Sequence, residues 1–292
     1  MNRGLVPFTT GYPVMRSRLT ETSIRDTSRL LKKPMTKTIA GKEIGMLINK
    51  PMIIAHRGAK GMAPENTLVA FQLGLSQGCE GIELDVHLSA DDEIVVCHDM
   101  TLDRTTDGKG LIAEKSLSEI KTYDAGFWFG DAFKGETVPT LDEVFDLVPD
   151  SIMINVEIKY SYDGRMEHKI VEILRRRNRL NNVIVSSFDH KCVRRIKQME
   201  SDAKIGLLYQ SKLLDPTAYA RSFDVEVYSL HPYFEMLDAE DVLNATESGL
   251  YVYPYTANEV NDLLHLTGLG VSGIITNFPG RLKDLLQTQD SK

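Results

Sequence analysis

Residues 81–98 read "GIELDVHLSADDEIVVCH", and the spacing within them distinguishes a hairpin from a crossover. They hold two β-rich runs, Gly81 to Val86 and Ile94 to His98, each dominated by branched apolar residues. Only His87 and residues 88–93 ("LSADDE") lie between them, whereas a crossover between parallel strands needs about a dozen residues or more. The two runs are therefore predicted to form an antiparallel hairpin.

Elsewhere after residue 50, short β-rich runs alternate with amphipathic helical segments, which implies parallel strands joined by right-handed crossovers. Without the returning strand of the hairpin, the number of candidate strands matches a (β/α)8 barrel. We predict an α/β fold, a (β/α)8 TIM barrel with a small inserted subdomain after the second strand and its hairpin. The predicted strands are Met52 to His56, Gly81 to Val86, Ile152 to Ile158, Val183 to Ser187, Lys204 to Leu208, Glu226 to Leu230, Tyr251 to Tyr255 and Ser272 to Thr276.

The barrel is predicted to cover residues 51–290, with an insertion at about residues 99–139. The insertion is rich in Gly, Asp and aromatic residues ("DAGFWFGDAF", residues 124–133), and we expect a small subdomain or lid beside the barrel mouth. Residues 1–50 are predicted to be a flexible N-terminal extension with a lead-in to the barrel, because residues 1–38 are polar and without apolar periodicity. An arginine-rich, acid-poor leader of this kind is also typical of an organelle transit peptide, and a second start at Met35 explains it equally well.

Charge and cysteine content disfavour several classes of protein. The net charge is −7 and the acidic excess lies beyond the basic leader, which argues against a nucleic-acid partner. No apolar stretch approaches the roughly 18 residues of a membrane-spanning helix, and the N-terminus lacks the pattern of a secretory signal, so we expect neither export nor stable membrane insertion. Cys79, Cys97 and Cys192 are scattered and form no CxxC pair, which fits a reducing cytoplasm better than a disulfide framework or a zinc site. The predicted location is cytoplasmic.

Three acidic residues lie toward the C-terminal ends of predicted strands, where barrel enzymes place their active sites. Glu83 and Asp85 are two residues apart on the second strand, so their side chains point to the same side, and Glu157 lies near the end of the third strand. Two carboxylates about 5 Å apart repel by about 3 kcal/mol at an effective dielectric constant of about 20. A cation must neutralise them, and a ligand set made of carboxylates favours Mg²⁺ or Ca²⁺ over zinc.

Histidines and cationic side chains are predicted to gather around these acids. His56 and Arg57 end the first strand, and Lys159 ends the third. A hairpin turn centred between residues 91 and 92 would set His98 opposite Asp85. Two histidines beside a metal-bound phosphate are the usual groups for moving protons at neutral pH, and Arg57 and Lys159 add positive charge for an oxyanion such as phosphate.

Each of these features also has a structural interpretation when it is taken alone. An E-x-D pair is more often a solvated strand face or part of an ion pair, and a single histidine is usually structural. We assign to this structural class His87, His168, His190 and His231. The catalytic interpretation is favoured because five candidate residues fall at the same end of one predicted barrel. These are His56, Glu83, Asp85, His98 and Glu157.

Several blocks of the sequence resemble, in order and spacing, those of the glycerophosphodiester phosphodiesterase family. They are "AHRG" with "PENT", "IELDVHLSADDEIVVCHDMTLDRTTDGKG", "FGDAFKGETVPTLDEV", "INVEIK" and "GIITNFPG". The resemblance covers about residues 51–287. It implies a barrel with a small inserted subdomain, and hydrolysis of small-molecule glycerophosphodiesters, such as glycerophosphocholine, to glycerol 3-phosphate and an alcohol.

The resemblance assigns roles to the residues that the strand ends bring together. It implies that the acid/base pair is His56 of "HRG" and His98 of "HD". It implies that Mg²⁺ or Ca²⁺ is held by Glu83, Asp85 and Glu157, and that the phosphate is contacted by Arg57 and Lys159.

Two positions depart from the pattern of the family. Tyr255 begins a block, "YTAN", that resembles W-T-V-N in the family, so an aromatic side chain with a smaller ring and a hydroxyl is predicted beside the substrate. Asn277 stands where Asp is frequent, which weakens any charged role there. Trp128, the single tryptophan, is predicted to pack within the insertion rather than to cover the substrate.

Two other functions are compatible with the sequence. One is a phospholipase of the C or D type on phospholipids or lysophospholipids, which would be favoured by an apolar patch at the rim of the barrel. The other is a noncatalytic phosphate-binding barrel, which would be expected to lack one member of the site, and none is missing. The sequence leaves open whether identical chains associate into a homo-oligomer.

Overall fold

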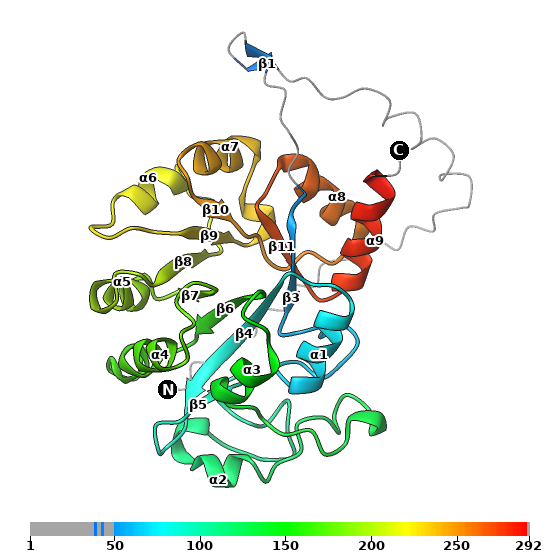
Figure 1. Ribbon diagram of the computed structural model, residues 1–292, viewed down its shortest axis with the longest axis vertical. Coiled ribbons are helices and arrows are strands. Elements are labelled where there is room, and N and C mark those ends of the chain that lie inside the picture. The colour runs from blue at the N-terminus through cyan, green and yellow to red at the C-terminus, as the bar shows by residue number, and fades with distance from the viewer. Residues whose placement is uncertain (1–37, 40–41, 44–49, 291–292) are drawn as a thin grey trace, which may run out of the picture. The chain divides into compact units, whose positions relative to one another are not determined.

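The strands of the barrel form one sheet in which neighbours run parallel. In the computed structural model, which describes residues 38–39, 42–43 and 50–290, their order is β10-β9-β8-β7-β6-β4-β3-β11 (Figure 1). Within residues 50–290 these strands are β3 (Met52–His56), β4 (Gly81–Leu88), β6 (Met153–Ile158), β7 (Val183–Ser187), β8 (Lys204–Tyr209), β9 (Ser229–Pro232), β10 (Tyr251–Val252) and β11 (Gly273–Thr276). Backbone hydrogen bonds also join the two end strands, from Ser272 N to Val252 O (3.0 Å) and from Ala257 N to Ile275 O (3.2 Å). The nearly closed parallel barrel confirms the predicted TIM fold.

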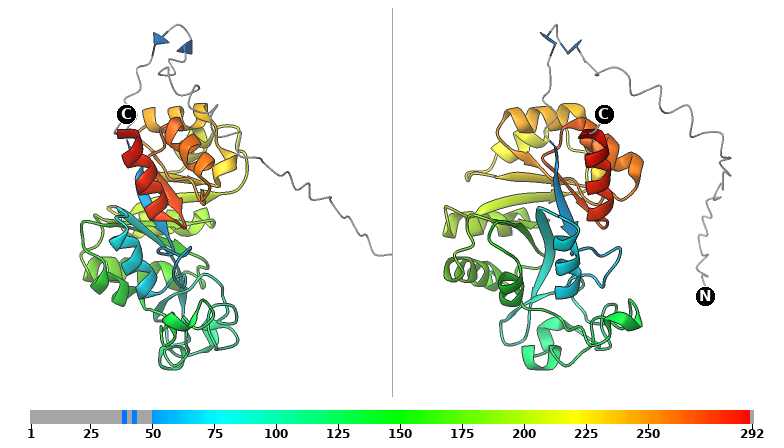
Figure 2. Two further views of the ribbon diagram at one scale, coloured as in Figure 1. Left: turned by 90° about the vertical axis from the view of Figure 1, so that its right-hand side faces the viewer. Right: turned by 45° about the vertical axis from the view of Figure 1, so that its right-hand side comes forward.

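Helices follow the strands and lie on the outer side of the barrel (Figures 1 and 2). Several begin at polar caps that satisfy free backbone N–H groups: the Thr67 hydroxyl accepts from Ala70 N, and Thr140 forms a capping box with Glu143. Thr67 and Thr140 are therefore the last residues of the loops that precede these two helices. The helices around the barrel are α1 (Leu68–Ser76), α3 (Leu141–Leu147), α4 (Arg165–Arg176), α5 (His190–Met199), α6 (Pro216–Arg221), α7 (Ala239–Glu247), α8 (Val260–Leu269) and α9 (Pro279–Asp290).

The strands are nearly continuous apolar runs because the helices cover one face of the sheet and the barrel interior covers the other. Every residue of β4 is buried. The interior contains a cluster of Ile54, Ile184, Tyr253 and Ile275. His56 lies two residues beyond Ile54 on β3, so the alternation of side chains directs it to the same interior face at the end of the strand.

The chain before the barrel is described only as a short antiparallel pair, β1 (Thr38–Ile39) and β2 (Lys42–Glu43). The rest of the extension predicted over residues 1–50 lies almost wholly outside the described residues. Among the helices that the structure describes, none has the length and apolar character needed to cross a membrane.

The predicted hairpin is confirmed, but its register is one residue away from the expected one. β5 (Ile94–Val96) pairs antiparallel with β4, and Cys97 N donates to Asp85 O (3.0 Å), so Cys97 rather than His98 lies opposite Asp85. The cause is a turn with an odd number of residues. Ser89 N donates to Glu93 O, which leaves a three-residue loop whose last member, Asp92, has a left-handed backbone (φ 60°).

Two strands of the barrel differ from the predicted ones by three residues at one end. β9 begins at Ser229 instead of Glu226, and β10 ends at Val252 instead of Tyr255. Pro254 has no N–H to donate and therefore interrupts the ladder of β10. The segment still follows β9, because Tyr253 N donates to Leu230 O (2.9 Å) and Tyr255 N donates to Pro232 O (3.0 Å).

The insertion after β5 has a hydrophobic core of its own. It contains α2 (Leu117–Ile120) and the short 3-10 helices η3 (Ile112–Glu114) and η4 (Asp131–Phe133), and it lies beside β5 at one end of the barrel (Figures 1 and 2). Trp128 is half-buried, and its contacts lie within the insertion: the indole N–H donates to Ala125 O (2.9 Å) and the ring meets Phe129 edge to face. The core consists of Val95, Cys97, Leu102, Ile112, Ile120, Ala125 and Val138.

Candidate active site

Three buried carboxylates from two neighbouring strands meet at the C-terminal end of the sheet. β4 and β6 are paired in parallel with Asp85 beside Glu157, and Glu83 lies two residues before Asp85 on the same face. One carboxylate oxygen from each of the three lies within 4.8 Å of the others. The sequence therefore placed these three residues correctly on one face.

The electrostatics of this cluster differ from one acid to the next. Burial, and the negative charges of Asp85 and Glu157, raise the pKa of Glu83 well above its usual range. Burial also acts to raise the pKa of Asp85, but two cations more than offset it: Arg57 Nε lies 3.1 Å from Oδ2 and Lys159 Nζ lies 3.5 Å from Oδ1. The positive charges of Arg57 and Lys159 are therefore too few to neutralise all three acids.

The donor set fits a hard divalent cation. The ligand atoms are all carboxylate oxygens, and they converge closely enough to share one ion. Arg57 and Lys159 already bring positive charge to Asp85. The pKa of Glu83 is nevertheless raised in their presence. A further positive charge at this point would relieve the repulsion that the buried acids create.

Arg57 is held by unusual backbone geometry. Its backbone is left-handed (φ 53°), which places its N–H 3.0 Å from Oε2 of Glu83, while its Nη1 donates to Oε1 of Glu65 (2.7 Å). Gly58 follows with φ 80°, and a Cβ there would lie 2.5 Å from the carbonyl carbon of Ala70. The glycine of "HRG" is therefore required by the shape of this loop, whereas Arg57 adopts a left-handed backbone that its side chain does not favour.

His56 has a defined hydrogen-bond partner for only one of its ring nitrogens. Nδ1 lies 2.7 Å from Oδ1 of Asn277 and donates to it, which leaves the lone pair on Nε2, 3.8 Å from Oε2 of Glu83. Burial and the nearby charges of Arg57 and Lys60 lower the pKa of His56 to about 3, so the ring is neutral at pH 7.

His98 follows β5 and is held through its side chain and its backbone. Its Nδ1 donates to Oδ1 of Asp99 (2.7 Å), and its carbonyl accepts from Nε2 of His87 (3.2 Å). Nδ1 of His87 in turn accepts from the Tyr162 hydroxyl (2.8 Å), so both ring nitrogens of His87 are engaged by protein groups. Burial lowers the pKa of His98 while the nearby Asp85 carboxylate opposes that shift, so the ring lies within electrostatic reach of the acids.

Tyr255 lies within electrostatic reach of Glu157, and its hydrogen-bonding and ring partners lie outside the cluster. Its hydroxyl donates to the carbonyl of Tyr209 (3.2 Å), and its ring packs edge to face against Phe188. The structure therefore supports an aromatic side chain near the acids, with the hydroxyl directed to the protein backbone.

The sequence predicted no role at the site for several polar residues that complete it. Asn66 Nδ2 donates to Oδ2 of Asp85 (2.9 Å), and Glu65 accepts from Arg57. Both lie in the "PENT" block, which was the signal that could have identified them. Asp99 and Asn277 orient the two histidines: Asp99 is next to His98 in the sequence, whereas Asn277 reaches His56 only through the tertiary fold.

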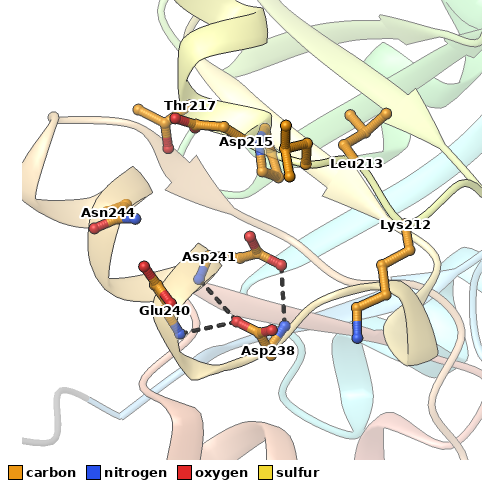
Figure 3. Close-up of a pocket in the computed structure, with 10 residues that line it drawn as sticks. Lys212, Leu213, Asp215, Thr217, Asp238, Glu240, Asp241 and Asn244 are labelled. Atoms are coloured by element: carbon orange, nitrogen blue, oxygen red, sulfur yellow. Dashed lines mark hydrogen bonds between the residues drawn. The ribbon is translucent and has the colours of Figure 1, made fainter.

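A separate hollow of about 570 Å³ lies between the loop after β8 and the start of α7 (Figure 3). Two of its acidic residues serve as helix caps: Asp238 accepts from Glu240 N and Asp241 N, and Asp241 accepts from Asp238 N. We therefore place the candidate active site at the carboxylate cluster and not in this hollow.

Comparisons with known proteins agree with this location. Residues 56–281 match the model of the glycerophosphoryl diester phosphodiesterase family. A glycerophosphodiester phosphodiesterase of Caldanaerobacter subterraneus is 41% identical over 242 residues, which are 82% of this chain and 98% of that protein. One of Bacillus subtilis is 30% identical over 265 residues, covering 84% and 90% of the two chains.

Solved structures give the same result. A phosphodiesterase of Oleispira antarctica, in complex with the product sn-glycerol-3-phosphate, superposes with a TM-score of 0.74 at 29% identity over 81% of this chain and 97% of its own. Because the family model and these relatives span the barrel and its insertion, the chain belongs to the glycerophosphoryl diester phosphodiesterase family and is a phosphoric diester hydrolase.

Proposed function

We propose that this protein hydrolyses glycerophosphodiesters to glycerol 3-phosphate and an alcohol in a reaction that needs a divalent cation and two histidines. The observation that carries the proposal is the convergence of three buried carboxylates, two cations and His56 at one end of the barrel, with His98 within electrostatic reach. The bound sn-glycerol-3-phosphate named for the Oleispira structure supports the same product.

The cation would be held by Glu83, Asp85 and Glu157, and the carboxylate ligands favour Mg²⁺ or Ca²⁺. When bound, it supplies positive charge to a non-bridging oxygen of the phosphate. Arg57 and Lys159 lie at the same acids and add charge for the phosphate.

The two histidines divide the proton transfers. His56 is neutral and presents Nε2, so it is suited to take a proton from the attacking hydroxyl. His98 donates Nδ1–H to the Asp99 carboxylate, and this hydrogen bond raises the pKa of His98 against the lowering effect of burial. When Nε2 also carries a proton, His98 gives that proton to the departing oxygen and is left neutral, with Nδ1–H still bonded to Asp99. The attacking hydroxyl belongs either to water or to the glycerol of the substrate, and a cyclic phosphate intermediate would identify the second case.

A panel of glycerophosphodiesters tests the proposal directly. We expect the purified protein to release glycerol 3-phosphate from glycerophosphocholine, glycerophosphoethanolamine and glycerophosphoglycerol with Mg²⁺ or Ca²⁺ present. Treatment with EDTA should abolish the release, and returning the metal should restore it. Activity that is indifferent to EDTA would contradict the carboxylate metal site.

A lysophospholipid substrate is a second candidate, because three exposed apolar side chains follow strands that end near the site. They are Tyr160 after β6, Phe188 after β7 and Leu214 in the loop after β8. These side chains could contact an acyl chain. Comparing lysophosphatidylcholine with glycerophosphocholine as substrates separates the two cases, since only the first carries an acyl chain.

The compartment and the assembly of the protein stay predictions. The three cysteines, Cys79, Cys97 and Cys192, are buried as free thiols, which supports the proposed reducing cytoplasm. A homo-oligomer would be tested by light scattering on the full chain.

A further inference from the structure

Arg104, a residue of the insertion, donates hydrogen bonds to two carboxylates of the candidate active site, Asp99 and Glu65. Its Nε and Nη2 donate to the two carboxylate oxygens of Asp99 (2.7 and 3.1 Å). Its Nη1 and Nη2 donate to the two oxygens of Glu65 (3.1 and 2.8 Å). A single guanidinium therefore holds two carboxylates, each through two hydrogen bonds.

Each of these carboxylates holds a residue of the proposed machinery. Asp99 accepts from Nδ1 of His98 (2.7 Å), and Glu65 accepts from Nη1 of Arg57 (2.7 Å). Arg57 then lies 3.1 Å from Asp85 through Nε. A continuous series of charged hydrogen bonds and ion pairs thus runs from the imidazole of His98, through Arg104, to the arginine at the metal site.

Asp99 has little else to fix its orientation. Its side chain is partly exposed and lies in the loop after β5, where a carboxylate can rotate freely unless it is held. Hydrogen bonds from Arg104, followed by that from His98, lower the pKa of Asp99 to about 2, so its carboxylate stays charged across the physiological range. The paired donors of Arg104 also fix the plane of the carboxylate, and that plane determines where the imidazole points.

We propose that Arg104 is a positioning residue, supplied by the insertion, that orients His98 and Arg57 at the same time through Asp99 and Glu65. This inference rests on the proposed function for its kinetic consequences. The inference also gives the insertion a role other than that of the predicted small subdomain or lid. In this role the insertion contributes a structural contact to the active site.

The first test replaces Arg104 and compares it with a matched arginine. Arg104→Ala should lower kcat by about tenfold to a hundredfold with a smaller change in KM, because the histidine is displaced while the metal ligands remain. Arg194 is the control. Like Arg104 with each of its partners, it binds a carboxylate, that of Asp224, through two donors, and its side chain is 43% exposed against 44% for Arg104. Arg194→Ala should leave kcat and KM unchanged, and the two variants should unfold at similar temperatures.

A second arm asks whether Arg104 acts through Asp99. Added guanidinium ion should restore part of the activity of Arg104→Ala, because the position is open to solvent, and should do nothing for Arg194→Ala. The double variant Asp99→Asn with Arg104→Ala should lose little more activity than the more damaging single variant. An Arg104→Ala enzyme with kcat within twofold of the wild type, or losses that multiply in the double variant, would overturn the proposal.

A spectroscopic readout keeps this inference separate from the proposed function. In the wild type, the ¹⁵N shifts of His98 should show a proton on Nδ1, and Arg104→Ala should redistribute that proton between Nδ1 and Nε2. If the wild type hydrolysed no glycerophosphodiester but this change were still seen, the proposed function would fail and the positioning role would stand. If the shifts of His98 were the same in both proteins, the positioning role would fail whatever the activity.

Discussion

His56 and Asn277 are paired across two strands that end side by side: Nδ1 of the imidazole lies 2.7 Å from Oδ1 of the amide. The pairing orients the ring without placing a negative charge against it. We predict that Asn277→Asp moves the acidic limb of the profile of kcat/KM against pH to higher pH, by about one pH unit or more. The reason is that a carboxylate there stabilises the imidazolium and raises the pKa of His56, which must be neutral to take a proton.

The control for this prediction is Asn244→Asp, the same change at an exposed position on α7. It should leave the pH profile in place. If the profile of Asn277→Asp also superposed on that of the wild type, His56 would not be the group whose protonation limits the reaction.

Removing either proposed proton-transfer group should be far more damaging than removing a surface histidine. His56→Ala and His98→Ala should each lower kcat by about a hundredfold or more, since general acid and base catalysis commonly contributes that much. His265→Ala, at an exposed position on α8, should leave kcat unchanged. Near-normal turnover in both active-site variants, measured by release of glycerol 3-phosphate, would reject the assignment.

The carboxylate cluster should cost stability when no metal is bound. Because the pKa of Glu83 is raised in the folded protein, the folded state holds that proton more tightly than the unfolded state does. Its contribution to the free energy of unfolding is fully present below the usual pKa of about 4.5 and is lost as pH rises through the folded-state value. The EDTA-treated protein should therefore lose stability across this range in urea titrations.

Glu83→Gln should remove that penalty. We expect the variant to unfold at a higher urea concentration than the EDTA-treated wild type at pH 7, and to be inactive even with Mg²⁺ or Ca²⁺ added, because one ligand is lost. Glu240→Gln, at an exposed site on α7, is the control and should change neither property. A Glu83→Gln protein less stable than the wild type in EDTA would show that Glu83 is not strained by its neighbours.

Gly58 should tolerate no side chain. Gly58→Ala combines a left-handed backbone (φ 80°) with a Cβ placed 2.5 Å from backbone atoms of α1. Gly135→Ala is the matched control, since Gly135 also has a positive φ (95°) but has open space around it. We expect Gly135→Ala to lower the free energy of unfolding by about 1 kcal/mol and Gly58→Ala by about 2 kcal/mol or more beyond that. Equal losses in urea titrations would contradict the close packing of this loop.

Much of the fold could be predicted because its signals are local. A strand of a parallel sheet is buried on both faces, so it appears in the sequence as a short apolar run, and the residues 88–93 are too few for a crossover. The exact register of the hairpin could not be read in the same way. It depends on whether the turn holds an even or odd number of residues, and the left-handed backbone of Asp92 sets that number.

Patterns along the chain were enough to predict the barrel, its insertion and the single face shared by Glu83, Asp85 and Glu157, because alternation along a strand and the common edge of parallel strands are local rules. Asp99 is next to His98 in the sequence, but the partner of His56, and the link from Asp99 through Arg104 to Glu65, emerged only in the folded chain. The Asn277 side chain reaches His56 from 221 residues away, and Arg104 reaches back 39 residues to Glu65. Contacts of this kind depend on side-chain directions that are fixed only when the strands close and the insertion packs against them, and no spacing along the chain specifies them.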